Sequence, residues 1–468
     1  MNHLDYYAGA QRPVETCVVG SGGFGRSFLA QGMRVPLMNA RIAVDVDASI
    51  AAAGFTALGV APADVALCRT AEEARLAWAA GKYIAAAELT TVLGLPIDVV
   101  VEATGNPEAG ARHARLAIEA DRHVVLVSKE VDSVVGPYLA QLARSRGKVV
   151  TPVDGDQPSL LIGLITWAQT LGFEIVAAGK SSEYDFVYDQ ATQTMSCDGK
   201  TFAIPGFDQH WTMGERPLGE LARARAEICA ALPQRAVPDL CELLVVANAT
   251  GFLADRADLH APIARIPEVP SFFGPLAEGG LLASERVLDV FHCLRRPDEA
   301  SFAGGVFVVV RCEDRVTWDL LAAKGHVISR DGARAMVYLP RHLLGLEAAT
   351  SVLDAAVHGR SSGAQSPQPR LDLIARATRR LAAGSMLAMG GHHHSIDGAS
   401  AELHAARSLA GTNAVPFYLA ANRPLARDVE AGAAITLDDI ELDQQSELLA
   451  LRRMQDLYFF GEPIAAPR

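Results

Sequence analysis

The sequence lacks features that would each define a class of protein. Its seven cysteines are scattered, with no C-x-x-C pair and no metal-finger spacing, which argues against a disulfide framework and indicates reduced thiols. The longest apolar runs, such as Ser159 to Leu171, fall short of the about 20 residues that span a bilayer. The N-terminus carries Asp5 and no apolar signal core. We therefore expect a cytoplasmic protein with no membrane partner.

Positive charge is also scarce in this chain. The 42 Lys and Arg residues face 54 Asp and Glu residues, for a formal net charge of −12. Nucleic acids and anionic membranes both require a basic surface, so the sequence predicts no nucleic-acid partner. A few local lysines and arginines suffice for a small-molecule substrate, and a phosphorylated or carboxylated one is expected.

The first 156 residues alternate short apolar runs with alanine-rich amphipathic stretches, without an internal repeat. The expected strands are Thr16–Val19, Arg41–Val46, Asp98–Glu102, His123–Ser128 and Lys148–Val153, and the expected helices include Pro107–Ala120 and Gly136–Arg146. Nearly continuous apolar strands are typical of a parallel sheet covered by helices on both faces. The sequence thus predicts an α/β fold, with a doubly wound Rossmann domain over residues 1–156. The intervening stretch Ala61 to Leu95 is expected to be mostly helical.

The pattern changes after residue 156 and predicts an α+β catalytic or dimerisation domain over residues 157–362. The expected helices are Ser159–Leu171, Leu218–Ala231 and Leu343–His358, the expected strands are Glu174–Ala178, Glu242–Ala247 and Gly305–Arg311, and a polar stretch runs to Gln209. Gly363 to Pro369 has the composition of a linker. Short strands and turns from Ala420 to about Ile440 then indicate a small β-rich C-terminal module within residues 363–468.

A glycine-rich turn lies between the first expected strand and a helix start. It contains Gly20, Gly22, Gly23, Phe24 and Gly25. In the G-x-G-x-x-G pattern, the first glycine permits the tight turn, the second lets the backbone approach a pyrophosphate, and the third allows close packing of helix on strand. The N–H groups at the helix start then hold the phosphates. This order of strand, turn and helix predicts a dinucleotide site.

The choice between NAD and NADP stays open at this level. Asp45 and Asp47 follow the second expected strand, about 20 residues after the glycine turn. An acid there favours the free 2′-hydroxyl of NAD, whereas Arg26 and Arg41 could accept the 2′-phosphate of NADP.

Polar residues follow the next expected strands, where ligands of a doubly wound sheet bind. Ala103, Thr104, Gly105 and Asn106 could lie against the nicotinamide and its ribose, although Asn106 is also a good helix cap. Ser128 and Lys129 end another strand. Lys129 could protonate or orient an oxygen at the site of hydride transfer, or it could be a solvated surface group.

Further candidates lie downstream. Asp154 and Asp156 flank a glycine and could bind Mg²⁺ or Mn²⁺, but Asp-Gly also favours a turn and Asp156 a helix start. Lys180 could bind a phosphate or carboxylate and Glu183 could be a third metal ligand, unless both belong to a polar loop. The run Gly390 to His394 contains three adjacent histidines, which favour capping or hydrogen bonding over metal ligation.

These motifs resemble known families. Gly20–Gly25, with Glu102–Pro107 and Val125–Lys129, resembles the nucleotide-binding domain of homoserine dehydrogenases over about the first third of the chain. Ser128-Lys129-Glu130 and Val153-Asp154-Gly155-Asp156 are similar to blocks of 1-deoxy-D-xylulose 5-phosphate reductoisomerase, in which Asn-Lys-Glu and Val-Asp-Ser-Glu stand. As a whole, the chain resembles reductoisomerase-like proteins that join a homoserine-dehydrogenase-like front to a C-terminal SAF-type module.

The resemblance implies an NADP-dependent oxidoreductase, with NAD possible, in which Asp154 and Asp156 bind a divalent metal that chelates the hydroxyketone of a sugar phosphate. Lys129 would then supply a proton or fix the oxygen. Two alternatives remain: a metal-independent dehydrogenase acting on a hydroxy acid or amino alcohol, and a regulatory protein that senses NAD(P). A homodimer is expected from the prevalence of symmetric dimers.

Overall fold

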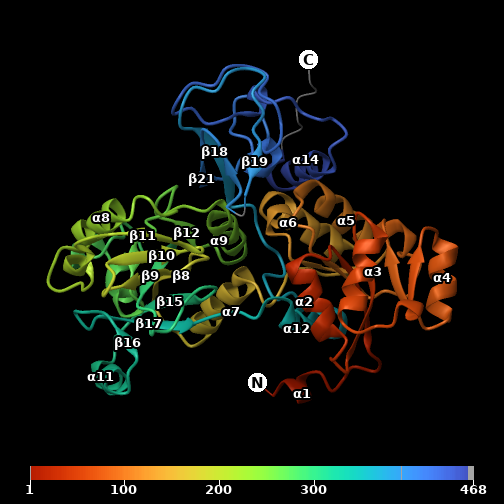
Figure 1. The fold of residues 1–468 in the computed structure, drawn as a ribbon, viewed down its shortest axis with the longest axis horizontal. Helices are drawn as coiled ribbons and strands as arrows, with labels where there is room; N and C mark the ends of the chain where they lie inside the picture. Colours follow the sequence, from red (N-terminus) through yellow and green to blue (C-terminus); the bar gives the residue numbers. More distant parts are fainter. Residues whose placement is uncertain (1, 392, 462–468) are drawn as a thin grey trace.

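The computed structural model describes residues 2–391 and 393–461. The chain forms three parts, with the N-terminal part on the right of Figure 1, the second part on the left and the C-terminal module above both. Within the described residues, no helix is both long enough and apolar enough to cross a bilayer.

The N-terminal part is built on a seven-stranded sheet of order β3-β4-β2-β1-β5-β6-β7, in which every neighbouring pair is parallel. Its elements are α1 His3–Tyr6, β1 Val14–Val19, α2 Gly23–Gly32, β2 Met38–Val44, α3 Ala48–Ala57, β3 Val65–Cys68, α4 Ala71–Ala79, β4 Tyr83–Ala86, β5 Val99–Glu102, α5 Pro107–Glu119, β6 His123–Leu126, α6 Lys129–Ser145 and β7 Val150–Pro152. The doubly wound α/β prediction is therefore confirmed. The stretch Ala61 to Leu95 was expected to be mostly helical, but it also supplies β3 and β4, which extend the sheet beyond β2.

The second part is a mixed sheet of order β11-β10-β9-β14-β8-β15-β17-β16, with β12 and β13 added beside β14. Its elements are α7 Gln157–Thr170, β8 Ile175–Ser181, β9 Phe186–Asp189, β10 Thr194–Cys197, β11 Lys200–Ala203, α8 Leu218–Ile228, α9 Val237–Thr250, β12 Leu253–Ala254, β13 Ile263–Ala264, α10 Val269–Phe272, β14 Val287–Arg295, β15 Val306–Arg311, α11 Arg315–Ala323, β16 Val327–Ile328 and β17 Arg334–Leu339. The stretch expected to be polar before Gln209 holds the meander β9 to β11.

One prediction for this part is wrong: Glu242–Ala247 is helical and lies within α9. Its apolar residues resemble a buried strand because α9 is buried on nearly all sides, and such a helix shows no amphipathic period. Pro238 in the first turn is the local signal that favours a helix instead.

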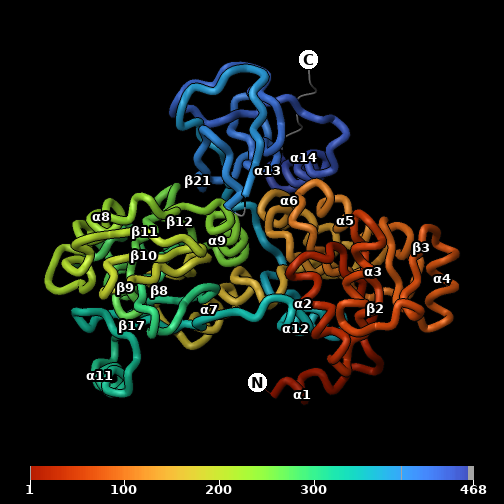
Figure 2. The backbone as a smooth tube through the Cα atoms, in the orientation of Figure 1, coloured from red at the N-terminus to blue at the C-terminus, as the bar shows by residue number. Residues whose placement is uncertain are grey.

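After β17 the chain returns to the N-terminal part before it enters the C-terminal module. The single helix expected over Leu343–His358 is instead broken into a 3₁₀ turn Leu344–Leu346, helix α12 Ala349–Leu353 and a π turn Asp354–His358. The 3₁₀ turn packs on α2, and Tyr7 donates to Asp354 at 2.9 Å. The cyan segment in Figure 2 follows this return.

The C-terminal module contains an antiparallel sheet of order β18-β21-β20-β19 and a closing helix. Its elements are β18 Leu371–Ala377, β19 Met389–Gly390, β20 Ser395–Ile396, β21 Ala399–Ala405, α13 Phe417–Ala420 and α14 Glu447–Phe460. Helix α14 packs on α5 and α6, while β18 and β21 pack on α9. The module therefore rests on both other parts at the place where they meet (Figure 1).

Candidate functional site

The glycine turn after β1 has the close packing that a dinucleotide site needs. Gly20 has φ +98°, and a Cβ on it would lie 2.5 Å from the carbonyl oxygen of Ala103. A Cβ on Gly25 would overlap the carbonyl oxygen of Gly20. Ser21 Oγ is buried without a hydrogen-bond partner in the described part of the chain. Because α2 starts at Gly23, the N–H groups of its first turn face the place where a diphosphate would bind, so the residues fit NAD(P).

The two acids after β2 have different surroundings. Asp45 accepts a hydrogen bond from Ser21 N–H at 2.7 Å, whereas Asp47 caps α3 by accepting from Ser49 N–H at 2.8 Å. The hydrogen bonds from Ser49 lower the pKa of Asp47. The guanidinium of Arg41 stacks 3.6 Å over Trp78, and Arg26 is exposed on α2. Of these four described residues, only Asp45 is bonded to the glycine turn through its side chain.

The ends of β5 and β6 are joined by side-chain hydrogen bonds. Thr104 Oγ1 donates to Glu102 Oε1 at 2.5 Å, and Gly105 N–H donates to Ser128 Oγ at 2.8 Å. Asn106 accepts from two N–H groups of α5, each at 3.0 Å, so its capping role is confirmed. The other predicted residues of these turns, from Ala103 to Gly105 together with Ser128, line a cavity, and their contact with a cofactor stays a prediction.

This cavity has a volume of about 640 Å³ and lies between the N-terminal and second parts. It runs from Phe24 of the glycine turn, past the carboxyl ends of β5 and β6, to β8 and α9. Its charged or ionisable lining residues are Lys129, Glu130, Asp156, Lys180, Glu183, Tyr184, Asp239, Glu242, His342 and His394. We call it the central cavity. Such a position at the carboxyl edge of a doubly wound sheet is where ligands of this architecture bind.

Two lysines from different parts of the molecule meet in the central cavity. Lys129 is the first residue of α6 and Lys180 lies in the buried strand β8. Both donate to Glu242 on α9, one to each carboxylate oxygen. Lys180 also donates to Asp239 at 2.6 Å, and Lys129 lies 3.7 Å from Asp156. The structure therefore brings together three predicted residues, Lys129, Lys180 and Asp156, around a carboxylate that the sequence analysis missed.

The cluster keeps its charges at neutral pH. Burial alone lowers the pKa of Lys129, but Asp156, Glu242 and Glu130 together raise it well above the ordinary lysine value. Burial likewise lowers the pKa of Lys180, and Asp239 and Glu242 outweigh it, so that the net shift is upward. Burial raises the pKa of Glu242, yet the two lysines bring it down to about 2. Lys129 is thus a charged hydrogen-bond donor in the resting site.

Glu130 is the second residue of α6 and behaves differently from its neighbours. It is 5% exposed and lines the central cavity. Burial raises its pKa from 4.5 to about 7, although Lys129 acts in the opposite direction. Because the folded state favours the protonated carboxyl, the contribution of Glu130 to stability is highest below about pH 4.5 and falls as the pH rises towards 7.

We expect Glu130→Gln to be more stable than the wild type at pH 8 and nearly equal at pH 4.5, because the amide never ionises. The gain at pH 8 has an upper limit of about 3 kcal/mol, at roughly 1.4 kcal/mol for each pH unit of displacement. Urea unfolding at the two pH values measures it, with the exposed Glu227→Gln on α8 as control. A difference from wild type that is the same at both pH values would contradict the burial argument.

The proposed metal pair is not brought together. Gly155 has φ +90° and turns the chain between the two acids. Asp156 faces Lys129, whereas Asp154 accepts from Thr350 Oγ1 at 2.7 Å and from Ser362 Oγ at 3.1 Å and lines a separate cavity of about 860 Å³. In residues 2–391 and 393–461, no group of three or more His, Cys, Asp or Glu side chains is placed to hold a metal ion. The residues present therefore do not fit the metal site expected from Asp154 and Asp156.

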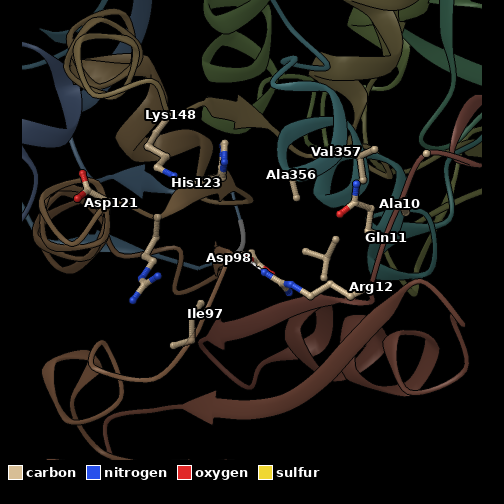
Figure 3. A pocket seen from close by; sticks show the side chains of 13 residues that line it. Ala10, Gln11, Arg12, Ile97, Asp98, Asp121, His123, Lys148, Ala356 and Val357 are labelled. Carbon is tan, nitrogen blue, oxygen red and sulfur yellow. Dashed lines mark hydrogen bonds and ion pairs between the residues drawn. The ribbon is translucent and has the colours of Figure 1, made fainter.

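A third cavity, of about 290 Å³, lies at the opposite edge of the N-terminal sheet, where β1, β5 and β6 begin. Figure 3 shows Arg12 directed at Asp98, and the two form a pair at 2.7 and 2.8 Å. His123 and Lys148 line the same cavity. Burial is the main cause that lowers the pKa of His123 to about 4. This cavity is remote from the glycine turn. The charges of Arg12 and Asp98 neutralise each other in their ion pair, so we assign the cavity no chemistry.

Sequence reasoning missed Asp239, Glu242 and His394. Asp239 and Glu242 lie three residues apart in α9, the spacing that places two side chains on one helix face. That signal was hidden because Glu242 was placed in the expected strand Glu242–Ala247. His394 stands in the histidine run, of which His392 lies outside the described residues. The hydrogen-bonding role expected of that run is confirmed for His394, whose Nδ1 lies 2.9 Å from Tyr418 Oη.

Comparison with known proteins adds one family match. Residues 155–211 and 237–348 match the model of the catalytic domain of oxidoreductase DRL. The match includes β8 and α9 and therefore Lys180, Asp239 and Glu242. A search of curated proteins finds no match for the chain.

Several solved structures resemble the chain at low identity. The WlbA dehydrogenase from Chromobacterium violaceum, in complex with NADH and UDP-GlcNAcA, is 16% identical over 39% of this chain and 46% of its own, with a TM-score of 0.27. UDP-N-acetylglucosamine 3-dehydrogenase GnnA from Acidithiobacillus ferrooxidans is 12% identical over 75% and 92%, with a TM-score of 0.38. A DOX-P reductoisomerase in complex with NADPH, fosmidomycin and magnesium is 15% identical over 50% and 57%, with a TM-score of 0.29. The chain thus spans less than two thirds of the length of the first and third of these proteins. TM-scores this low carry no information on function.

The structure and the family match together confirm the coarser part of the sequence interpretation. The chain has a Rossmann-type α/β fold, and the strands of its second sheet lie within the segments that match an oxidoreductase catalytic domain. The homoserine-dehydrogenase likeness, the SAF-type module and the reductoisomerase activity stay predictions.

Proposed function

We propose that the protein is an NAD(P)-dependent oxidoreductase that transfers hydride at a carbonyl or hydroxyl carbon of a hydroxyketone or related sugar. The observation that carries this proposal is the Lys129–Glu242–Lys180 cluster at the carboxyl edge of a Rossmann-type sheet. The match to an oxidoreductase catalytic domain over the segments that carry Lys180 and Glu242 supports it.

Each residue of the cluster has a role in this reaction. In the direction of reduction, the bound dihydronicotinamide would supply a hydride to the carbonyl carbon. Lys129 Nζ, held charged by Glu242 and Asp156, binds the carbonyl oxygen, stabilises the charge that develops there and gives it a proton. Lys180 and Asp239 fix the carboxylate of Glu242 and so hold Lys129 in place.

The charge of the central cavity favours an uncharged substrate. Among the described residues, its lining contains two lysines and no arginine. The same lining contains five carboxyl groups, which belong to Glu130, Asp156, Glu183, Asp239 and Glu242. Carboxylates accept hydrogen bonds from sugar hydroxyls, whereas they repel a phosphate that must be desolvated beside them. We therefore place a neutral ketose or polyol ahead of a sugar phosphate.

The cofactor is expected to be NAD. Asp45 is bonded to the glycine turn, where it can accept a hydrogen bond from a free ribose 2′-hydroxyl and repel a 2′-phosphate. Arg41, one of the two cations that could favour NADP, is stacked on Trp78.

A metal-dependent reductoisomerase is the second candidate. The family match and the presence of Asp156 and Glu183 in the central cavity favour it. Asp154 has no part in this version because it faces another cavity.

The test is a turnover assay with D-xylulose, 1-deoxy-D-xylulose and their 5-phosphates, each with NADH and NADPH, before and after treatment with EDTA. We expect oxidation of NADH with a non-phosphorylated ketose and unchanged rates in EDTA. Activity confined to 1-deoxy-D-xylulose 5-phosphate and lost in EDTA would replace this proposal by the reductoisomerase. If neither cofactor is oxidised with any of the four sugars, the proposal of hydride transfer to this class of substrate is wrong.

A further inference from the structure

The C-terminal module reaches into the central cavity through one hairpin. The turn between β19 and β20 carries His393 and His394, and His394 is a lining residue of the cavity. The carbonyl oxygen of His393 accepts from Val237 N–H, at the start of α9, at 3.3 Å. The ring of His393 meets Tyr184, another lining residue, edge to face, with 6.0 Å between centroids. His394 of this turn therefore forms part of the cavity wall.

The backbone and its neighbours fix the orientation of His394. Its φ of +51° is a left-handed conformation that a residue other than glycine adopts at an energetic cost, and such strain collects at functional sites. Its Nδ1 lies 2.9 Å from Tyr418 Oη of α13 and 3.9 Å from Glu130 Oε1 of α6. The imidazole is thus held between the C-terminal module and the helix that begins with Lys129.

The module that carries the hairpin is itself anchored through buried groups. Gln455 of α14 donates to the carbonyl oxygen of Val134 in α6 at 3.0 Å and accepts from Tyr138 N–H at 3.2 Å. Within the module, the fully buried Arg452 donates to both carboxylate oxygens of Asp372 at 2.6 and 2.9 Å. These bonds join α14 of the module to α6, the helix that begins with Lys129.

We propose that the C-terminal module completes the catalytic cavity and that His394 is a substrate-contacting residue, with Tyr418 as its positioning residue. The proposal rests on the proposed function, because the ligand is the same neutral ketose whose carbonyl oxygen Lys129 binds. His394 binds a hydroxyl of that ketose beside Glu130. The module is accordingly a specificity element, since changes in its hairpin alter which sugar fits.

Steady-state kinetics with D-xylulose and NADH tests this assignment. We expect His394→Ala to raise KM for the sugar at least tenfold and to change kcat much less. His394→Gln, whose amide nitrogen can take the place of Nε2, should stay within about threefold of wild type, and Tyr418→Phe should raise KM to an intermediate value. Ser395→Ala, one residue further along the same hairpin and exposed, is the matched control. Wild-type KM in His394→Ala would overturn the proposal.

A second measurement needs no turnover and so separates this inference from the proposed function. All seven native cysteines are buried, so His394→Cys provides a thiol that a methanethiosulfonate reagent can label selectively. We expect NADH with saturating D-xylulose to slow labelling of His394→Cys at least fivefold and to leave Ser395→Cys unchanged. Protection in a protein that does not oxidise NADH would retain the binding site and discard hydride transfer. Equal labelling rates with and without the sugar would overturn the role of His394.

Discussion

Lys129→Met is expected to reduce turnover of a ketose by about a thousandfold, within the range of 10²–10⁴ for a lost general acid. Methionine has a similar length but cannot bind or protonate the substrate oxygen. Glu242 keeps its second partner, Lys180, so the fold should survive the change. Binding of NADH, which depends on the glycine turn, should stay at the wild-type level. The measurements are kcat with D-xylulose and the fluorescence titration of NADH.

The matched control for this variant is Lys148→Met. Lys148 lines the cavity at the opposite edge of the N-terminal sheet, so the same change there should leave turnover intact. A Lys129→Met enzyme that keeps more than a tenth of wild-type turnover would remove Lys129 from the chemistry. A wild-type protein that binds NADH tightly but transfers no hydride, with Lys129→Met binding it equally well, would favour the NAD(P)-sensing alternative.

Glu242→Gln is expected to destabilise the protein more than any other single change in the cavity, by about 3–5 kcal/mol, because it leaves the buried Lys180 and the partly buried Lys129 without their shared anion. The sign of the pH dependence follows from the pKa of about 2 in the folded state. A lowered carboxyl pKa adds stability that is complete above about pH 4.5 and is lost as the pH falls through 2. The difference between wild type and variant should therefore be large at pH 7 and shrink steadily between pH 4.5 and 2.

Urea unfolding at pH 7, 4 and 2.5 measures this difference, with Glu220→Gln on the exposed face of α8 as control. A loss below 1 kcal/mol at pH 7 would mean that the lysines do not depend on Glu242. A loss that is equal at all three pH values would show that the effect is one of packing rather than charge.

The parts of the site that follow a strand directly could be predicted from the sequence. The glycine turn, the Thr104–Gly105 turn and Lys129 each follow a short apolar run, and a doubly wound sheet places all such ends along one edge. Lys180 was a candidate for the same reason, although β8 extends through it. These signals are local, so neighbouring residues were enough to find them.

The partners of the lysines could not be predicted, because they depend on contacts between distant elements. Glu242 reaches Lys129 and Lys180 only once α9 packs between the N-terminal part and the second sheet. The structure does not support the pairing of Asp154 with Asp156, for a related reason: Thr350 and Ser362, which bind Asp154, belong to the segment that returns from β17. His394 enters the cavity from a third part of the chain. The homodimer and the cytoplasmic localisation stay predictions of the sequence alone.

The most direct test of the account is a fluorescence titration of the wild type with NADH and NADPH, beside Gly25→Ala and Gly219→Ala. A Cβ on Gly25 would overlap the backbone of Gly20, whereas one on Gly219 would meet no atom within 4 Å. We predict saturable binding of NADH, weaker binding of NADPH, loss of both in Gly25→Ala and no change in Gly219→Ala. A wild-type protein that binds neither reduced cofactor at millimolar concentration would contradict the dinucleotide site, and with it the role of the lysine cluster in hydride transfer.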